Sequence, residues 1–225
     1  MRKATLLLLM LAAMLNMNAQ TDDEYLMEIG GGVGFLGYLG DYNNVLTSDL
    51  QPMATLLVRR NLNPYMGLRL AASFGKLKGD ERDVKTVYPS TGVTPYSFSR
   101  TLTDVSLTYE YNFWPYGTGH DYYGAKRLTP FVFLGLGGTY AGGDGSSVFT
   151  ANVPIGLGLK YKVGQRMNVG VEWAMHFSMS DKLDGRKDPY GITSSGMFKN
   201  TDCYSVLQLT LSYSFMPKCT TCNKD

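Results

Sequence analysis

Glutamate, histidine and serine side chains follow one another on a single stretch of the chain, at Glu172, His176 and Ser178. An acid, a histidine and a serine are the residue types of a nucleophile that a general base activates. The stretch alternates apolar and polar residues, as a strand does, and a strand separates the three side chains by about 13 Å and about 7 Å. They cannot all be hydrogen-bonded neighbours unless other strands supply residues. We therefore predict a structural role for them and no enzyme activity.

The cysteines form a second group with chemical potential. Cys219 and Cys222 make a CxxC pair in "KCTTC", close to the end of the chain. A thioredoxin-like site needs a strand followed by a helix, and a zinc site needs a second pair of ligands. Neither is expected here, and Cys203 lies at the far end of the preceding stretch. Cys219 and Cys222 are expected either to pair with each other or to form a disulfide with a partner protein.

A glycine-rich segment, "GVGFLG" at 32–37, matches the letters of a dinucleotide-binding fingerprint. That chemistry requires a turn that opens onto a helix N-terminus. The following "YLGDYNN" is typical of a loop, and glycines on one face of a strand allow a sheet to curve. The sequence therefore predicts no nucleotide and no other cofactor.

The elements that carry these residues are strands. Apolar side chains recur at every second position in most of the chain, as in Leu207, Leu209, Leu211 and Tyr213. The same alternation predicts strands at 25–35, 65–74, 104–113, 153–163, 169–179 and 207–215. Residues 52–60 are predicted to form a seventh strand, with Leu56 and Val58 outward. Residues 129–141 are predicted to form an eighth, but both of its faces are apolar, so its phase, meaning which face points outward, stays open.

The length of these strands indicates a membrane. Most contain about ten or more residues, which is enough for a tilted strand to cross a bilayer. Aromatic residues gather at strand ends, as in the girdles of outer-membrane barrels. We predict an all-β, eight-stranded antiparallel transmembrane barrel of the outer membrane, with the up-and-down order of OmpA. A soluble exported β-sandwich or a lipocalin-like barrel is the alternative.

The polar face of the predicted strands carries as many acids as bases. Eight strands enclose a space that side chains can fill, so we expect a salt-bridged, hydrogen-bonded plug. A substrate channel is the alternative, and it needs more strands than this chain provides. The members of the predicted interior network are Glu28, Arg59, Arg69, Asp104, Glu110, Lys160, Lys162 and Glu172.

The two ends of the chain predict export. A basic head, an apolar run over 6–15 and Ala19 are typical of a secretory signal. We divide the chain into a signal peptide at 1–19, the barrel at 20–216 and a cysteine-containing periplasmic tail at 217–225.

The formal net charge of +2 gives no argument for nucleic acid. Membrane lipid is an expected partner, in the outer membrane of a Gram-negative bacterium.

With both termini in the periplasm, the connections alternate between the two sides of the membrane. The expected external loops are 38–51, 77–101, 142–150 and 180–203, and the expected inner turns are 61–64, 114–128 and 164–168. Outer-membrane barrels have long external loops and short periplasmic turns. The inner turn at 114–128 is an exception because of its length.

Several segments resemble the PorG-like family of outer-membrane barrels of the type IX secretion system. They are "YEYNFWPYGTGHDYYGAKRLTPFVFLGLG", "RRNLNPYMGLRLAASFGKLKGD", "EWAMHFSMSDKLDG" and "NTDCYSVLQLTLSYSF". The resemblance implies an eight-stranded barrel without catalytic residues. It also implies contact with a periplasmic ring built by a lipoprotein and its soluble partner, which are PorK- and PorN-like.

The long inner turn is the expected docking surface for such a ring. Its aromatic and charged residues are Trp114, Pro115, Tyr116, His120, Asp121, Tyr122, Tyr123, Lys126 and Arg127. The sequence thus favours a barrel that anchors or organises a periplasmic secretion assembly. An OmpA-type structural or adhesion barrel, which acts through its external loops, and a lipid-modifying enzyme are the alternatives.

Overall fold

The computed structural model describes residues 25–39, 49–80, 97–118, 124–143, 146–180 and 202–217. Strands occupy most of these residues, and each contains between 12 and 17 residues. The strands are β1 (Tyr25–Leu39), β2 (Gln51–Asn63), β3 (Met66–Asp80), β4 (Ser97–Asn112), β5 (Leu128–Gly143), β6 (Ser146–Lys162), β7 (Met167–Ser178) and β8 (Cys203–Pro217).

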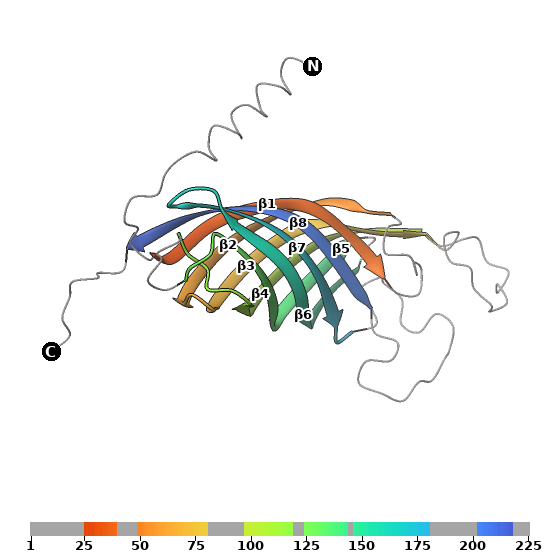
Figure 1. Cartoon of the computed structure of the whole chain (residues 1–225). Coiled ribbons are helices and arrows are strands. Elements are labelled where there is room, and N and C mark those ends of the chain that lie inside the picture. The colour runs from red at the N-terminus through yellow and green to blue at the C-terminus, as the bar shows by residue number, and fades with distance from the viewer. Residues whose placement is uncertain are drawn as a thin grey trace, which may run out of the picture.

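The eight strands close into one barrel in which each strand pairs antiparallel with its neighbours in the sequence. The ladder between β1 and β8 closes it and runs from Tyr25↔Pro217 to Leu39↔Cys203. The start of β1 and the end of β8 therefore share one end of the barrel (Figure 1). We call this the turn end, because it also holds the connections 64–65, 113–127 and 163–166, and we call the opposite end the loop end. The predicted fold is confirmed.

An apolar belt covers the outside of the barrel. Outward positions such as Val33, Leu56 and Leu136 are 65%, 65% and 69% exposed, so they have no protein partner to cover them. A surface of this kind suits lipid, and a closed ladder leaves no unpaired strand edge inside the hydrocarbon. Among the described residues, no helix is long and apolar enough to cross a membrane.

Several strands extend further than the alternation predicts. The segment 142–150 was expected to be an external loop, but residues 142–143 and 146–150 belong to β5 and β6, which remain paired up to Gly143↔Ser146. Residues 97–101 also belong to β4 and pair with the end of β3. These extensions have polar outward residues such as Lys76 and Thr101. Backbone pairing thus continues beyond the apolar belt, where the alternation that identifies a strand has already ended.

The phase of β5, left open by its sequence, is fixed by the pairing. Phe131 and Phe133 point inward and are buried, whereas Leu134 points outward. Glycines on β6 face both rings, through the pairs Phe131↔Gly158 and Phe133↔Gly156. A Cβ at Gly156 would overlap the Phe133 ring and lie 2.6 Å from the Trp173 carbonyl oxygen. The missing side chains therefore make room for two rings inside the barrel.

The alternation implied a polar interior, but part of the interior is apolar. Near the loop end it holds a cluster of buried apolar side chains, in which Tyr38 meets Phe98 edge-on at 5.1 Å between ring centroids. Leu36, Leu77 and Leu102 belong to the same cluster. These residues lie toward the loop end, where they pack among the buried charged residues Arg100 and Asp202, whereas the large ion-pair cluster lies in the turn half.

Candidate functional site

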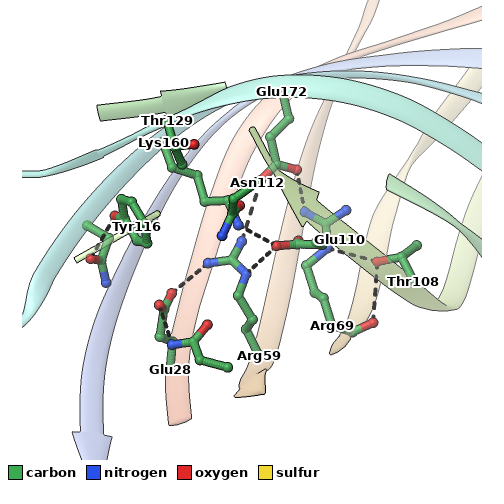
Figure 2. Close-up of polar contacts among 12 residues, drawn as sticks. Glu28, Arg59, Arg69, Thr108, Glu110, Asn112, Tyr116, Thr129, Lys160 and Glu172 are labelled. Atoms are coloured by element: carbon green, nitrogen blue, oxygen red, sulfur yellow. Dashed lines mark hydrogen bonds and ion pairs between the residues drawn. The ribbon is translucent and has the colours of Figure 1, made fainter. Parts of the chain in front are cut away.

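Six charged side chains meet inside the turn half of the barrel (Figure 2). Glu110 on β4 is at the centre: its carboxylate lies 2.8 Å from Arg59 Nε, 3.2 Å from Arg69 Nε and 2.6 Å from Lys160 Nζ. Arg59 also pairs with Glu28, and Arg69 Nη1 lies 2.6 Å from Glu172. Three acids from β1, β4 and β7 thus face three bases from β2, β3 and β6.

Neutral groups complete the shell around these charges. Asn61 Nδ2 donates to Glu28 at 2.9 Å, and Gln208 Nε2 donates to Glu172 at 3.0 Å. The Arg69 guanidinium lies 4.5 Å from the Phe133 ring centroid, and Lys160 Nζ lies 4.2 Å from that of Phe131. The inward phenylalanines of β5 therefore cover the cations, which keeps the ion pairs out of water.

The other two members of the predicted network lie apart from these six. Lys162 lies closer to the turn end, with its ammonium 3.4 Å from Asn168 Oδ1 and 5.5 Å from the Tyr116 ring centroid. Asp104 accepts hydrogen bonds from Thr139 and from the Tyr204 hydroxyl, each at 3.0 Å. All eight predicted side chains are buried inside the barrel, but they form one central cluster with two separate neighbours.

Glu172, His176 and Ser178 do not form a catalytic arrangement. Glu172 pairs with Arg69, and the His176 ring stacks on Tyr204 at 4.5 Å between centroids. Ser178 donates to the carbonyl oxygen of Ser180 at 3.1 Å. Within the described residues, no group of three or more His, Cys, Asp or Glu side chains is placed to hold a metal ion.

The long connection between β4 and β5 is fastened to the turn end. The Tyr116 amide donates to the Pro64 carbonyl at 3.0 Å, and the Lys126 amide donates to the Pro115 carbonyl at 2.7 Å. The Tyr116 side chain enters the barrel, where its hydroxyl donates to Asn168 Oδ1 at 2.9 Å. Burial, aided by the Glu28 carboxylate, raises the pKa of Tyr116 well above its usual value.

This position bears on the predicted docking surface, of which Tyr116 is a member. The Tyr116 side chain is half-buried and its hydroxyl is held by Asn168, so only part of it faces solvent. Trp114 and Lys126 are exposed, and the Lys126 ammonium lies 4.7 Å from the Trp114 ring centroid. Pro115 and Arg127 are half-buried beside them. The remaining predicted members, His120, Asp121, Tyr122 and Tyr123, lie outside the described residues, as do the signal peptide at 1–19 and the tail cysteines Cys219 and Cys222.

Sequence reasoning missed two buried asparagines that link the turn to the barrel. Asn112 Nδ2 donates to the Pro64 carbonyl at 3.0 Å, and Asn168 Nδ2 donates to the Ser214 hydroxyl at 2.9 Å. Both occupy inward positions of their strands, so the alternation contained the signal. The inward turn of Tyr116 had no such signal, because it follows the end of β4.

A family model covers almost the whole chain. It is described as a domain of unknown function, DUF6089, and it matches residues 2–224. The chain belongs to this family. No curated protein is detectably similar to it in sequence.

Solved structures with a similar fold include an outer-membrane protein. OprG from Pseudomonas aeruginosa aligns with a TM-score of 0.50 at 12% identity, over 88% of this chain and 99% of that chain. Neisserial surface protein A aligns with a TM-score of 0.48 at 12% identity, over 84% and 97% of the two chains. Ail of Yersinia pestis, in complex with the heparin analogue sucrose octasulfate, aligns with a TM-score of 0.47 at 10% identity, over 87% of this chain and 100% of that chain. Identities this low show the fold alone, which is that of an eight-stranded outer-membrane barrel.

Replacing Tyr116 with alanine is expected to release the connection at 113–127. Burying an aromatic side chain contributes about 1.5–3 kcal/mol, so its loss raises the population of the open segment about tenfold or more. Trypsin should then cleave after Lys126 or Arg127 correspondingly faster, as mass spectrometry of timed digests would show. Phe113→Ala removes an exposed aromatic from the same segment, one whose ring contacts Tyr111 and not the cleavage site, and should leave the cleavage rate unchanged. Equal rates in the two variants would show that Tyr116 does not fasten the segment.

Proposed function

We propose that the chain is a non-enzymatic outer-membrane barrel that docks a periplasmic protein assembly at its turn end. In this proposal both termini lie in the periplasm, and the assembly is the ring of a type IX secretion system. In this proposal the barrel is not a channel, and the buried charged and aromatic side chains in its turn half support this. Its task is to hold the assembly at the membrane.

The observation that carries this proposal is the ordered backbone of residues 113–118 and 124–127, the described parts of the connection between β4 and β5. The neighbouring connections at 64–65 and 163–166 are tight, whereas this one is long and its described parts are joined to each other and to Pro64 by backbone hydrogen bonds. A surface segment that is already ordered loses little conformational entropy when a partner binds. It presents Trp114 with Lys126 and Arg127, and Trp and Arg are frequent energetic centres of protein interfaces.

Charge supports a specific kind of partner. In the described residues of the turn end, Glu28, Glu110 and Glu172 are all buried, and the exposed or half-exposed charges are cationic. An acidic partner surface would meet opposite charges on these described residues, and a basic partner would be repelled by them. The resemblance of "NFWPYGTG" and the following residues to PorG-like barrels supports the ring as the partner.

The two alternatives make different demands on the chain. A lipid-modifying enzyme needs reacting groups within reach of one another, and Glu172, His176 and Ser178 have separate partners. An adhesion barrel would act through the loop end, so changes at the turn end would leave its activity intact. The docking experiment therefore separates the proposed function from adhesion.

The proposal is tested by affinity purification from crosslinked membranes. We expect the triple variant Trp114→Ala, Lys126→Glu and Arg127→Glu to recover at least about tenfold less of the periplasmic ring components, because it removes an aromatic anchor and reverses the charge. The matched control is Lys76→Glu with Lys78→Glu, which reverses two exposed charges at the loop end. This control should recover ring components as the natural chain does.

Two results would contradict the docking proposal. If the natural chain recovered no ring component, the ring would not be its partner. If the turn-end variant recovered as much as the natural chain, the connection at the turn end would not be the docking surface. Heat-dependent mobility on gels shows that each variant has folded into a barrel.

A further inference from the structure

Two arginines point away from the barrel at the turn end. Arg60 is on the outward face of β2, between the outward residues Val58 and Leu62, and Arg166 ends the turn between β6 and β7. Both side chains are exposed, and neither forms an ion pair with a described residue. A cation in a lipid-facing row is stable where it reaches the level of the lipid headgroups.

Arg166 is held in a fixed orientation by two tyrosines of the outer wall. Its Nε donates to the Tyr25 hydroxyl at 3.0 Å, and its Nη1 donates to the Tyr213 hydroxyl at 2.9 Å. The guanidinium also lies 5.3 Å from the Tyr25 ring centroid. A guanidinium carries five N–H groups, so several remain for an anion, and a fixed guanidinium loses little freedom on binding one.

The strand register brings Arg60 to the same patch. Met27 on β1 pairs with Arg60 on one side and with Phe215 on the other. Neighbouring strands are about 4.8 Å apart, so the Cα atoms of Arg60 and Phe215 are separated by about 10 Å. Tyr25 lies two residues from Met27 on β1, and Tyr213 lies two residues from Phe215 on β8. Because these two tyrosines hold Arg166, both guanidinium groups border one outward patch on β8, β1 and β2.

An apolar hollow lies on the same strands, closer to the loop end. It is lined by the outward residues Gly31, Val33, Ala54, Leu56, Leu209 and Leu211. Gly31 has no side chain and Ala54 has a small one, so the wall is recessed between larger neighbours. Outward Ile29 and Val58, which are 53% and 37% exposed, form an apolar path from the hollow to the arginines.

We propose that this patch binds a membrane phospholipid, with the phosphate on Arg60 and Arg166 and one acyl chain in the hollow around Gly31. Guanidinium groups bind phosphate oxygens through paired, charge-assisted hydrogen bonds. No exposed carboxylate competes for them among the described residues of the turn end. A free phosphate would use only the arginines, whereas the adjoining hollow fits a ligand that also has a hydrocarbon chain.

This inference does not depend on the proposed docking function. The lipid site uses the outer wall of β8, β1 and β2, whereas docking uses the connection at 113–127. The site also does not require a particular orientation of the termini, since phospholipid is tested directly. Either proposal can fail while the other stands.

Native mass spectrometry of the detergent-purified chain, titrated with phosphatidylglycerol, tests the site. We expect the Arg60→Gln and Arg166→Gln double variant to bind this lipid about tenfold or more weakly, because two charge-assisted contacts are lost. Ala54→Leu fills the hollow and should weaken binding while both arginines remain. Lys126→Gln with Arg127→Gln removes the same charge elsewhere at the turn end and should not change the affinity.

The source of the phosphate is distinguished by two further ligands. Inorganic phosphate at millimolar concentration should not displace the lipid, and diacylglycerol, which lacks phosphate, should bind as weakly to the natural chain as to the double variant. Displacement by inorganic phosphate, with no effect of Ala54→Leu, would assign the arginines to a free anion and overturn the proposal. An equal loss of affinity in the Lys126 and Arg127 control would also overturn it, since binding would then follow net charge alone. Heat-dependent gel mobility confirms that each variant is folded before titration.

Discussion

Replacing Arg59 with methionine is expected to lower the free energy of unfolding by about 3–5 kcal/mol. Arg59 is only 3% exposed and contacts both Glu28 and Glu110. Its removal leaves buried carboxylates with less positive charge nearby, and an uncompensated buried charge is far more costly than a missing contact. Urea unfolding in detergent micelles, followed by the fluorescence of Trp114 and Trp173, measures the change.

The adjacent residue provides the matched control. Arg60 has the same side chain but points outward, so Arg60→Met should change the free energy of unfolding by no more than about 0.5 kcal/mol. In the double variant Arg59→Met and Glu28→Met, part of the lost stability should return, because both partners of one pair are removed together. Equal effects at Arg59 and Arg60, or strictly additive effects in the double variant, would contradict the buried network.

Replacing Gly34 with alanine is expected to destabilise the barrel by about 3 kcal/mol, the upper end of the usual range for overpacking. Gly34 pairs with Gln208 where β1 meets β8. A Cβ at this position would overlap the Leu207 carbonyl oxygen and lie 2.6 Å from the Gln208 Cα. Backbone atoms cannot change rotamer to avoid the clash, so the two closing strands would have to separate. Urea unfolding and the folded fraction on unheated gels report the effect.

Gly164 is the control for this substitution. A Cβ added there would have no atom within 4 Å, and the residue lies in the turn between β6 and β7. Gly164→Ala should therefore be neutral or slightly stabilising, because alanine restricts the unfolded chain. If Gly34→Ala were as stable as Gly164→Ala, the close approach of β1 and β8 would be excluded.

Much of the fold was predictable because every strand meets the same two environments. Lipid requires apolar side chains at alternate positions, and this requirement identifies Leu207, Leu209 and Leu211 as outward without any knowledge of their neighbours. The inward direction of Glu110 follows from the same alternation. Strand number and closure then follow, because a membrane sheet with a free edge would leave backbone groups unpaired.

The strand ends and strand phase that the sequence did not predict lie where a strand does not have lipid on one side and a polar interior on the other. Above the belt there is no lipid, so the paired ends of β5 and β6 carry no alternation and were expected to be a loop. In β5 both faces are apolar, because Phe131 and Phe133 pack on buried cations inside the barrel. Tyr116 follows the last strand position and is directed by contacts with Pro64 and Asn168, which no local pattern contains.

The sequence by itself determined which side of each predicted strand faces lipid, since that depends only on the alternation within one segment. The tertiary structure alone decided which charges meet. Glu110 contacts Arg59, Arg69 and Lys160, which come from three other strands. These contacts depend on the register of each ladder and on the curvature of the closed sheet. Both are set by the ring of strands as a whole, so no single segment of the sequence records them.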